Sequence, residues 1–196
     1  MTLPFILASG SPRRRELLTS LGIVFTVIKP DIDETEQSGE DPVAYVRRLS
    51  REKADAVAAR LNEPAAILAA DTTVIHDGRI LGKPATADEA RAMLFELRGT
   101  GHTVCTALTL QRTDSPLRTR TEHTLTTVVM RPYTDAEIEA YIASGDPFDK
   151  AGGYAIQHTG FAPAARIEGS QTNVVGLPVE TLRVMLADFG LLESGI

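Results

Sequence analysis

The sequence predicts an α/β protein of two lobes, in which helices flank a long mixed β-sheet. Apolar runs that are typical of strands alternate with capped helices throughout the 196 residues. Two long threonine-rich runs, 103–111 and 119–130, follow one another along the chain and predict an antiparallel pair. We therefore expect an elongated single domain, residues 1–196, with a functional cleft between its two lobes.

The first half of the chain contains clear helix-start and turn signals. Ser11 and Pro12 are suited to the N-cap and first position of a helix, and Asp41 and Pro42 repeat this pattern. The Asp77-Gly78 pair predicts a tight hairpin between residues 73–76 and 79–81. The remaining predicted strands are 3–9, 24–28 and 65–70, and the predicted helices are 13–21 and 42–61.

The second half continues the alternation of helices and strands. Thr86 with Glu89, and Thr134 with Glu137, have the capping-box spacing and predict two helices that end at Gly99 and Gly145. A last helix is expected to follow Pro178, after a loop over residues 173–178. Further strands are expected at 153–157 and 164–167.

Composition excludes several classes of function. The formal net charge of −6 argues against general nucleic-acid binding, which requires a basic surface, and favours a small phosphorylated substrate for the local basic motifs. The one cysteine, Cys105, cannot form an internal disulfide and is expected in the core. Neither a signal peptide nor a long apolar segment is visible, so we expect a cytoplasmic protein that does not cross a membrane.

Three arginines occupy the first turn of the first predicted helix. Arg13, Arg14 and Arg15 stand where positive charge opposes the helix dipole, while the free amides of the helix start favour anions. One interpretation is that an anion binds between them. The alternative is a basic patch that is simply exposed to water.

Asp71 and Lys53 are polar residues in apolar surroundings. Asp71 directly follows the apolar run 65–70, so it is either a turn residue or a metal ligand or base at the carboxyl end of a strand. Lys53 falls on the apolar stripe of the helix 42–61. It either extends its ammonium to the edge of that stripe or points into a cleft.

Weaker signals come from three loops. Lys83 lies in a Gly-Lys-Pro turn, and no Gly-x-x-x-x-Gly-Lys-Ser/Thr loop is present. Gln157 is either an exposed strand end or a reader of a base edge, because its amide both donates and accepts. The four acids of one loop are either solvated or oxygen ligands for a cation such as Mg²⁺; they are Asp31, Asp33, Glu34 and Glu36.

Taken together, several short motifs in a fixed order resemble the Maf family of nucleoside triphosphate pyrophosphatases. The resemblance extends from Leu7 to about Pro178. Each motif is weak alone, but seven in the same order are not expected by chance. They are Ser9-Gly10-Ser11-Pro12-Arg13-Arg14, Asp33-Glu34-Thr35, Arg51-Glu52-Lys53-Ala54, Ala70-Asp71-Thr72, Gly82-Lys83-Pro84, Asp149-Lys150-Ala151-Gly152 and Val175-Gly176-Leu177-Pro178.

The resemblance implies a fold similar to that of the inosine-triphosphate pyrophosphatases, a homodimer and a divalent cation, Mg²⁺ or Mn²⁺. It implies cleavage of a nucleoside triphosphate to the monophosphate and pyrophosphate, with Asp71 as catalytic base and with Glu34 and Asp71 as metal ligands. Cationic side chains would neutralise the triphosphate. The implied substrate-binding residues are Ser9, Ser11, Arg13, Arg14, Lys53, Thr72, Lys83 and Gln157.

The expected substrates are dTTP and UTP, since the opening motif and Gln157 are similar to those of the family branch that acts on these nucleotides. The Gln157 amide can accept from N3–H and donate to O4, an edge that uracil and thymine share. His158 next to this amide is less usual for the branch. Two alternatives stay open: the same reaction on a modified purine such as 7-methyl-GTP, and a non-catalytic nucleotide-binding regulator of septum formation.

Overall fold

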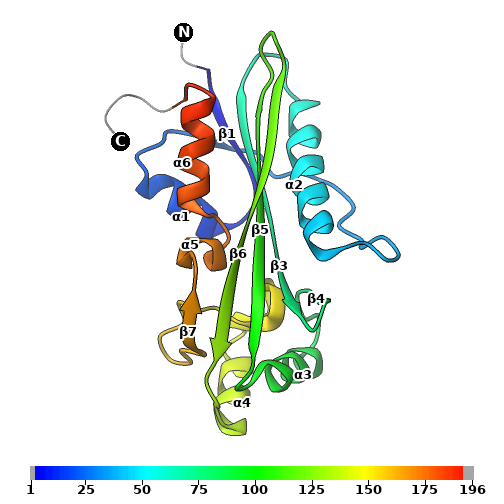
Figure 1. Cartoon of the computed structure of the whole chain (residues 1–196), viewed down its shortest axis with the longest axis vertical. Helices are drawn as coiled ribbons and strands as arrows, with labels where there is room; N and C mark the ends of the chain where they lie inside the picture. The colour runs from blue at the N-terminus through cyan, green and yellow to red at the C-terminus, as the bar shows by residue number, and fades with distance from the viewer. Residues whose placement is uncertain (1–2, 192–196) are drawn as a thin grey trace.

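The computed structural model describes residues 3–191, which form a mixed seven-stranded sheet with helices on both faces (Figure 1). The strand order is β2-β1-β3-β5-β6-β7, and β4 pairs with β3. The strands are β1 (Phe5–Ala8), β2 (Thr26–Val27), β3 (Ala66–His76), β4 (Arg79–Leu81), β5 (Gly101–Arg112), β6 (Arg118–Met130) and β7 (Ala164–Glu168).

The sheet combines a parallel part with an antiparallel part. β2, β1 and β3 are parallel, whereas β3, β5, β6 and β7 are antiparallel neighbours. The β5–β6 pair runs along most of the long axis of the molecule (Figure 1). The predicted mixed sheet and the predicted antiparallel threonine-rich pair are confirmed.

Helices cover the two faces of the sheet unequally. In Figure 1, α1 (Pro12–Ser20), α5 (Gln171–Val175) and α6 (Val179–Asp188) lie on one side of the long strands, and α2 (Pro42–Ala58) lies on the other. α3 (Ala87–Leu97) and α4 (Asp135–Ala143) lie at the end far from the N-terminus. Within residues 3–191, no helix is long and apolar enough to cross a membrane.

β3 is buried on both faces, which explains its continuous apolar run. Leu68 and Ala70 pack into a core cluster with α1 and α6, whereas Ile67 and Ala69 pack into another with α2. Because successive side chains of a strand point to opposite faces, Asp71 is directed to the α2 side and the next residue to the α1 side. The alternation of side chains along β3 therefore determines which helix lies next to Asp71 and which lies next to Thr72.

The structure corrects three predicted elements. The strand predicted to end before Asp71 continues to His76, because Lys53 neutralises the aspartate and β5 pairs with β3 on both sides of it. The predicted strand 153–157 is instead a 3₁₀ turn, η2 (Ala151–Gly153), followed by a loop. Gly152, at φ 70°, adopts a backbone conformation that a strand does not contain. The predicted loop 173–178 begins inside the short helix α5.

Candidate active site

The candidate site lies where β3 changes partners on one edge. β1 pairs with β3 up to Ala69, and β4 pairs with it from Val74, so the stretch between has no strand on that edge. On the other edge β5 pairs with β3 throughout. This break in the pairing exposes Asp71 and Thr72 to a pocket while the strand itself stays straight and fixed.

This pocket has a volume of about 490 Å³ and contains every residue that the sequence analysis assigned to the site. The N-terminus of α1, the acidic loop, α2, β3 and the segment after η1 (Asp146–Asp149) all contribute to its wall. The ten assigned residues that line it are Ser9, Ser11, Arg13, Arg14, Glu34, Lys53, Asp71, Thr72, Lys83 and Gln157.

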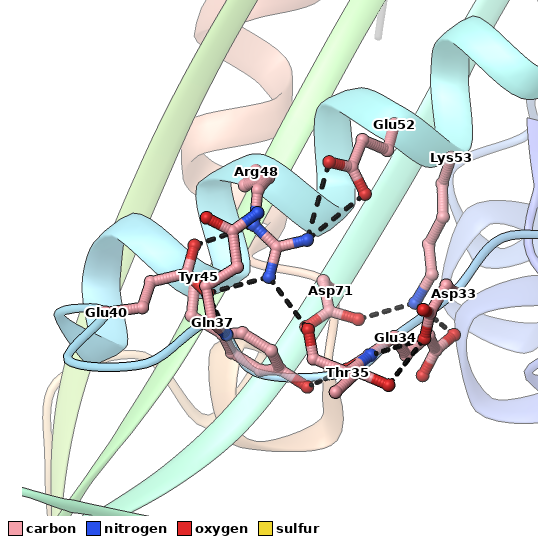
Figure 2. A network of polar contacts seen from close by, with 10 residues as sticks. All are labelled: Asp33, Glu34, Thr35, Gln37, Glu40, Tyr45, Arg48, Glu52, Lys53 and Asp71. Carbon is pink, nitrogen blue, oxygen red and sulfur yellow. Dashed lines mark hydrogen bonds and ion pairs between the residues drawn. The ribbon is translucent and has the colours of Figure 1, made fainter.

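Lys53 joins two carboxylates at the centre of the pocket (Figure 2). Its Nζ lies 2.5 Å from Oδ1 of Asp71 and 2.8 Å from Oε1 of Glu34. Lys53 is 6% exposed and Asp71 7% exposed, so both charges are held almost entirely within the protein. The expectation that Lys53 points from the apolar stripe of its helix into a cleft is confirmed.

Burial and neighbouring charges shift the two carboxyl groups in opposite directions. Burial raises the pKa of Asp71, and the charges of Lys53 and Arg14 only partly oppose this effect. Partial burial also raises the pKa of Glu34, but the hydrogen bond and charge of Lys53 outweigh it, so the net pKa of Glu34 is lowered. Asp71 is therefore the stronger base of the pair.

The acidic loop is held on α2 by side chains that the sequence analysis did not select (Figure 2). The Tyr45 hydroxyl donates to the Glu34 carbonyl at 2.9 Å, and the Arg48 guanidinium donates to the Thr35 carbonyl at 3.1 Å. Asp33 accepts hydrogen bonds from the backbone and hydroxyl of Thr35. Of the four acids in the loop, Glu34 is the one that lines the pocket.

Arg14 ties the start of α1 to β3 and to the turn after α5. Its Nε donates to the Gly176 carbonyl at 2.8 Å, its Nη1 to the Ala70 carbonyl at 2.9 Å, and its Nη2 to the Thr72 hydroxyl at 2.9 Å. Nη1 also contacts Ser9 Oγ at 3.2 Å. The Ala70 carbonyl, which has no strand partner on this edge of β3, thus accepts a hydrogen bond from Arg14, and the Arg14 side chain lines the pocket.

Other cations reach the pocket from different directions. Arg13 Nη1 lies 3.3 Å from Oδ2 of Asp149, which belongs to the opposite wall. Lys83 and Lys29 line the pocket and are exposed, and neither forms an ion pair with another residue in the described part of the chain. Arg15 is exposed and lies outside the pocket, as the solvated alternative for that residue predicts.

The donor set fits a divalent cation that is shared with a phosphate. Glu34 and Asp71 both contact one ammonium, so this point of the pocket already accommodates a positive charge between two carboxylates. Mg²⁺ is typically held by one or two carboxylates together with substrate phosphate oxygens. Residues 3–191 contain no group of three or more acidic, histidine or cysteine side chains arranged for a metal, so substrate oxygens would have to complete the coordination.

Five further pocket residues with charged or phenolic side chains were not assigned to the site by the sequence analysis. Asp149 and Lys150 belonged to a quoted motif, and that motif was the available signal. Tyr154 belongs to the Tyr-Ala-Ile-Gln segment that carries Gln157 and resembles the same family branch. Lys29 and Tyr45 gave no signal, because a lone lysine and a helix tyrosine are common outside functional sites. Their position in the pocket depends on contacts between segments far apart in the chain.

Comparisons with known proteins identify the family of this chain. Residues 4–189 match the family model described as Maf-like protein. The chain is 50% identical to a dTTP/UTP pyrophosphatase from Chromobacterium violaceum, covering 94% of this chain and 93% of the relative. It is 48% identical to a dTTP/UTP pyrophosphatase from Salinibacter ruber, covering 99% and 96%.

Solved structures of low sequence identity share the fold. The structure of a HAM1 protein from Coxiella burnetii is similar with a TM-score of 0.52 at 17% identity, covering 95% of this chain and all of that one. The Ham1 protein of Staphylococcus aureus gives a TM-score of 0.52 at 13% identity, over 95% and 99%. Since the family model covers nearly the whole chain, the protein is a member of the Maf family.

Proposed function

We propose that this chain hydrolyses dTTP and UTP to the corresponding monophosphate and pyrophosphate. The observation that carries the proposal is the buried Asp71 carboxylate beside Lys53, in a pocket that further cations enter from several sides. The names of the two relatives, both about half identical over nearly the whole chain, support the choice of substrates.

The charges of the pocket match a triphosphate. A nucleoside triphosphate carries about four negative charges, and catalysis of its cleavage depends mainly on positioning and charge stabilisation. Lys29 and Lys83 line the pocket without an ion pair among the described residues and are available to phosphate oxygens. Arg13 lies 3.3 Å from Asp149, and Lys53 is shared between two carboxylates. The pocket therefore contains cationic side chains that can bind the triphosphate and stabilise the leaving pyrophosphate.

Asp71 is suited to accept the proton of the attacking water. The water oxygen forms a bond to the α-phosphorus, the bond from this phosphorus to the bridging oxygen breaks, and its electron pair leaves on pyrophosphate. One proton passes to Asp71, whose raised pKa makes it a better acceptor than an exposed aspartate. Lys53 holds Oδ1 of the carboxylate and leaves Oδ2 for the water.

We also propose that Glu34 and Asp71 hold a divalent cation together with the substrate. Such a cation supplies positive charge that neutralises phosphate oxygens and lowers the barrier to attack. Chelation with EDTA is expected to abolish pyrophosphate release, and added Mg²⁺ or Mn²⁺ is expected to restore it. Full activity in EDTA after dialysis would contradict this part of the proposal.

We propose that Gln157 recognises the base. It lines the pocket, is exposed, and lies in the turn that follows η2 and Tyr154. Its amide can accept from N3–H and donate to O4 of either uracil or thymine, which accounts for two substrates with one side chain. Discrimination against cytosine requires that the amide be held in one orientation.

A panel of nucleoside triphosphates tests the proposal. Purified protein is incubated with UTP, dTTP, CTP, GTP and 7-methyl-GTP in the presence of Mg²⁺ or Mn²⁺, and pyrophosphate is measured. We expect the highest kcat/KM with UTP and dTTP. Faster cleavage of 7-methyl-GTP would favour the modified-purine alternative, and no cleavage of any nucleotide would favour a binding role.

We further propose a homodimer in the cytoplasm, as the family resemblance implies. Sedimentation equilibrium tests the first part: a mass near twice 21.1 kDa is expected, and a mass of one chain at micromolar concentration would contradict it. Fractionation of cells that express the chain tests the second part.

A further inference from the structure

Tyr141 lies behind the pocket and contacts the segment that carries Gln157. It belongs to α4, is 2% exposed and does not line the pocket. Its hydroxyl accepts a hydrogen bond from the Ala155 backbone N–H at 3.0 Å and donates one to Oδ2 of Asp146 at 2.6 Å. One phenol thus connects the pocket-lining segment to the loop that follows α4.

The Asp146 side of this connection is rigid. Lys150 Nζ donates to Oδ1 of Asp146 at 2.9 Å, to its carbonyl at 2.6 Å, and to Oδ1 of Asp149 at 2.6 Å. Lys150 is 8% exposed, whereas the Asp146 side chain is 30% exposed, so the ammonium is held within the protein by charge-assisted bonds. Burial raises the pKa of Tyr141, which keeps its hydroxyl protonated and able to donate.

The ring of Tyr141 is fixed independently of its hydroxyl. It stacks on Phe161 with centroids 4.3 Å apart and an interplanar angle of 13°, and meets the His158 ring edge-on at 4.8 Å. Removing the hydroxyl therefore leaves the ring in place. The Ala155 N–H would then lose the acceptor that the structure gives it.

The other hydrogen bonds of this segment lie within its own turn or after Gln157. The His158 N–H donates to the Ala155 carbonyl at 3.3 Å, and Arg131 donates to carbonyls further along the segment. Between Gly153 and the start of β7 at Ala164 the chain forms no helix or strand, and Ala155 precedes Gln157 by two residues. On the near side, Tyr154 is held through its hydroxyl, 2.5 Å from Nε2 of His102. Ahead of Gln157, the segment is thus held by the Tyr141 hydroxyl at the Ala155 backbone and by the Tyr154 hydroxyl at His102.

We propose that Tyr141 is a positioning residue for base selection: its hydroxyl, held by Asp146 and Lys150, fixes the backbone at Ala155 and thereby orients the Gln157 amide. This inference rests on the proposed hydrolysis of dTTP and UTP and assigns selectivity to a residue that does not touch the nucleotide. It also supplies the fixed amide orientation that rejection of cytosine requires.

Tyr141→Phe and Tyr133→Phe form a matched pair that tests the proposal. Tyr133 is equally buried and does not line the pocket, and its hydroxyl donates to the Leu94 carbonyl at 2.7 Å rather than contacting the backbone of residues 155–157. Both variants are expected to lower the melting temperature to a similar extent. Only Tyr141→Phe is expected to raise KM for UTP and dTTP, by roughly five- to twentyfold with kcat nearly unchanged.

Two further readouts separate positioning from a general structural effect. The preference for UTP over CTP is expected to fall in Tyr141→Phe and to stay at the wild-type value in Tyr133→Phe. Competitive inhibition by inorganic tripolyphosphate, which occupies only the phosphate side, is expected to be the same in all three proteins. Weaker tripolyphosphate inhibition in Tyr141→Phe would overturn the assignment to the base side.

The failures of the two proposals are distinguishable. If wild type cleaves UTP and dTTP but Tyr141→Phe behaves like Tyr133→Phe in KM and in base preference, the positioning role is wrong and the proposed function stands. If wild type cleaves neither nucleotide, both proposals fail. Should Tyr141→Phe not fold, Asp146→Asn keeps the phenol and weakens its acceptor, and the same fall in base preference is required of it.

Discussion

Asp71 is a carboxylate that is both desolvated and paired. Its burial raises the pKa, while Lys53 and Arg14 oppose the shift and Glu34 adds to it. A catalytic base benefits from this balance, because burial lets it accept a proton more readily than an exposed aspartate while the neighbouring cations favour its ionised form. The environment of one side chain thus decides whether the pocket is reactive.

The position of the acid limb of the pH–rate profile tests this environment. Activity requires ionised Asp71, so kcat/KM is expected to fall as pH drops through a value above the ordinary 3.8 of an aspartate. Arg14→Gln removes a positive neighbour of Asp71 and is expected to move the limb to higher pH, whatever it does to the maximal rate. A limb that does not move, or moves to lower pH, would contradict the assignment of that limb to Asp71.

The residue types of the site were accessible from the sequence, but their roles were only partly so. Lys53 stood out because it interrupts an apolar stripe, and Asp71 because it follows an apolar run. That Lys53 bridges Asp71 and Glu34 could not be derived, since it depends on how three segments pack. Arg14 was expected beside an anion, whereas most of its donors bind protein oxygens.

Among the elements, β3 determines the site most directly. On one edge of β3, the parallel partner β1 and the antiparallel partner β4 leave residues 70–73 unpaired. The turn after α5 lies over this gap and is held there by the hydrogen bond from Arg14 to the Gly176 carbonyl. The sequence analysis ended the strand at Asp71 because a charged residue usually ends a buried strand. Neutralisation by a residue 18 positions away was the missing information.

Gly176→Ala is expected to disturb this closure. Gly176 has φ 112°, and a Cβ there would lie 3.2 Å from Thr72 Oγ1 and 3.5 Å from Arg14 Nε. We expect a loss of about 1–3 kcal/mol in the free energy of unfolding from backbone strain and a clear rise in KM for the nucleotide. Urea unfolding and steady-state kinetics measure the two effects.

Gly22→Ala is the matched control for that substitution. Gly22 also has a positive φ, 72°, but a Cβ there would meet open space, and the residue does not line the pocket. It should lose stability through strain and keep wild-type KM. Equal changes in KM for both variants would show that Gly176 has no special link to the site.

In the whole molecule, the hydrophobic core of the described residues divides into separate clusters. One core cluster contains residues of α3, α4 and the aromatic side chains Tyr133, Tyr154 and Phe161, and another joins β1, α1 and α6. The sequence predicted the mixed sheet and most helices, because caps and apolar periodicity are local signals. It did not predict η2 or α5, because short turns depend on tertiary contacts.

His102, on β5 beside Tyr154, makes the free energy of unfolding depend on pH. His102 is 4% exposed, and burial lowers its pKa to about 4. A histidine in the unfolded chain titrates near 6.5, so below this pH the unfolded state gains protons that buried His102 does not. The free energy of unfolding is therefore expected to fall by about 3 kcal/mol as pH decreases from above 6.5 towards 4. Urea unfolding at pH 7 and pH 4.5 is expected to show the loss.

His102→Asn isolates this contribution. The variant lacks the titrating ring, so its unfolding free energy is expected to fall less between pH 7 and pH 4.5 than that of wild type, although it starts from a lower value. Carboxylates that also titrate in this range are common to both proteins and cancel in the comparison. The same decrease in both proteins would rule out His102 as the source.

The central claim is that Asp71 performs chemistry on a bound nucleoside triphosphate, and the most direct measurement combines turnover and binding in Asp71→Asn. We expect pyrophosphate release from UTP and dTTP to fall by at least about a thousandfold, while calorimetric binding of a non-hydrolysable analogue stays within about tenfold of wild type. Asp77→Asn, in the exposed turn between β3 and β4, should match wild type in both. Undiminished turnover in Asp71→Asn would contradict the account.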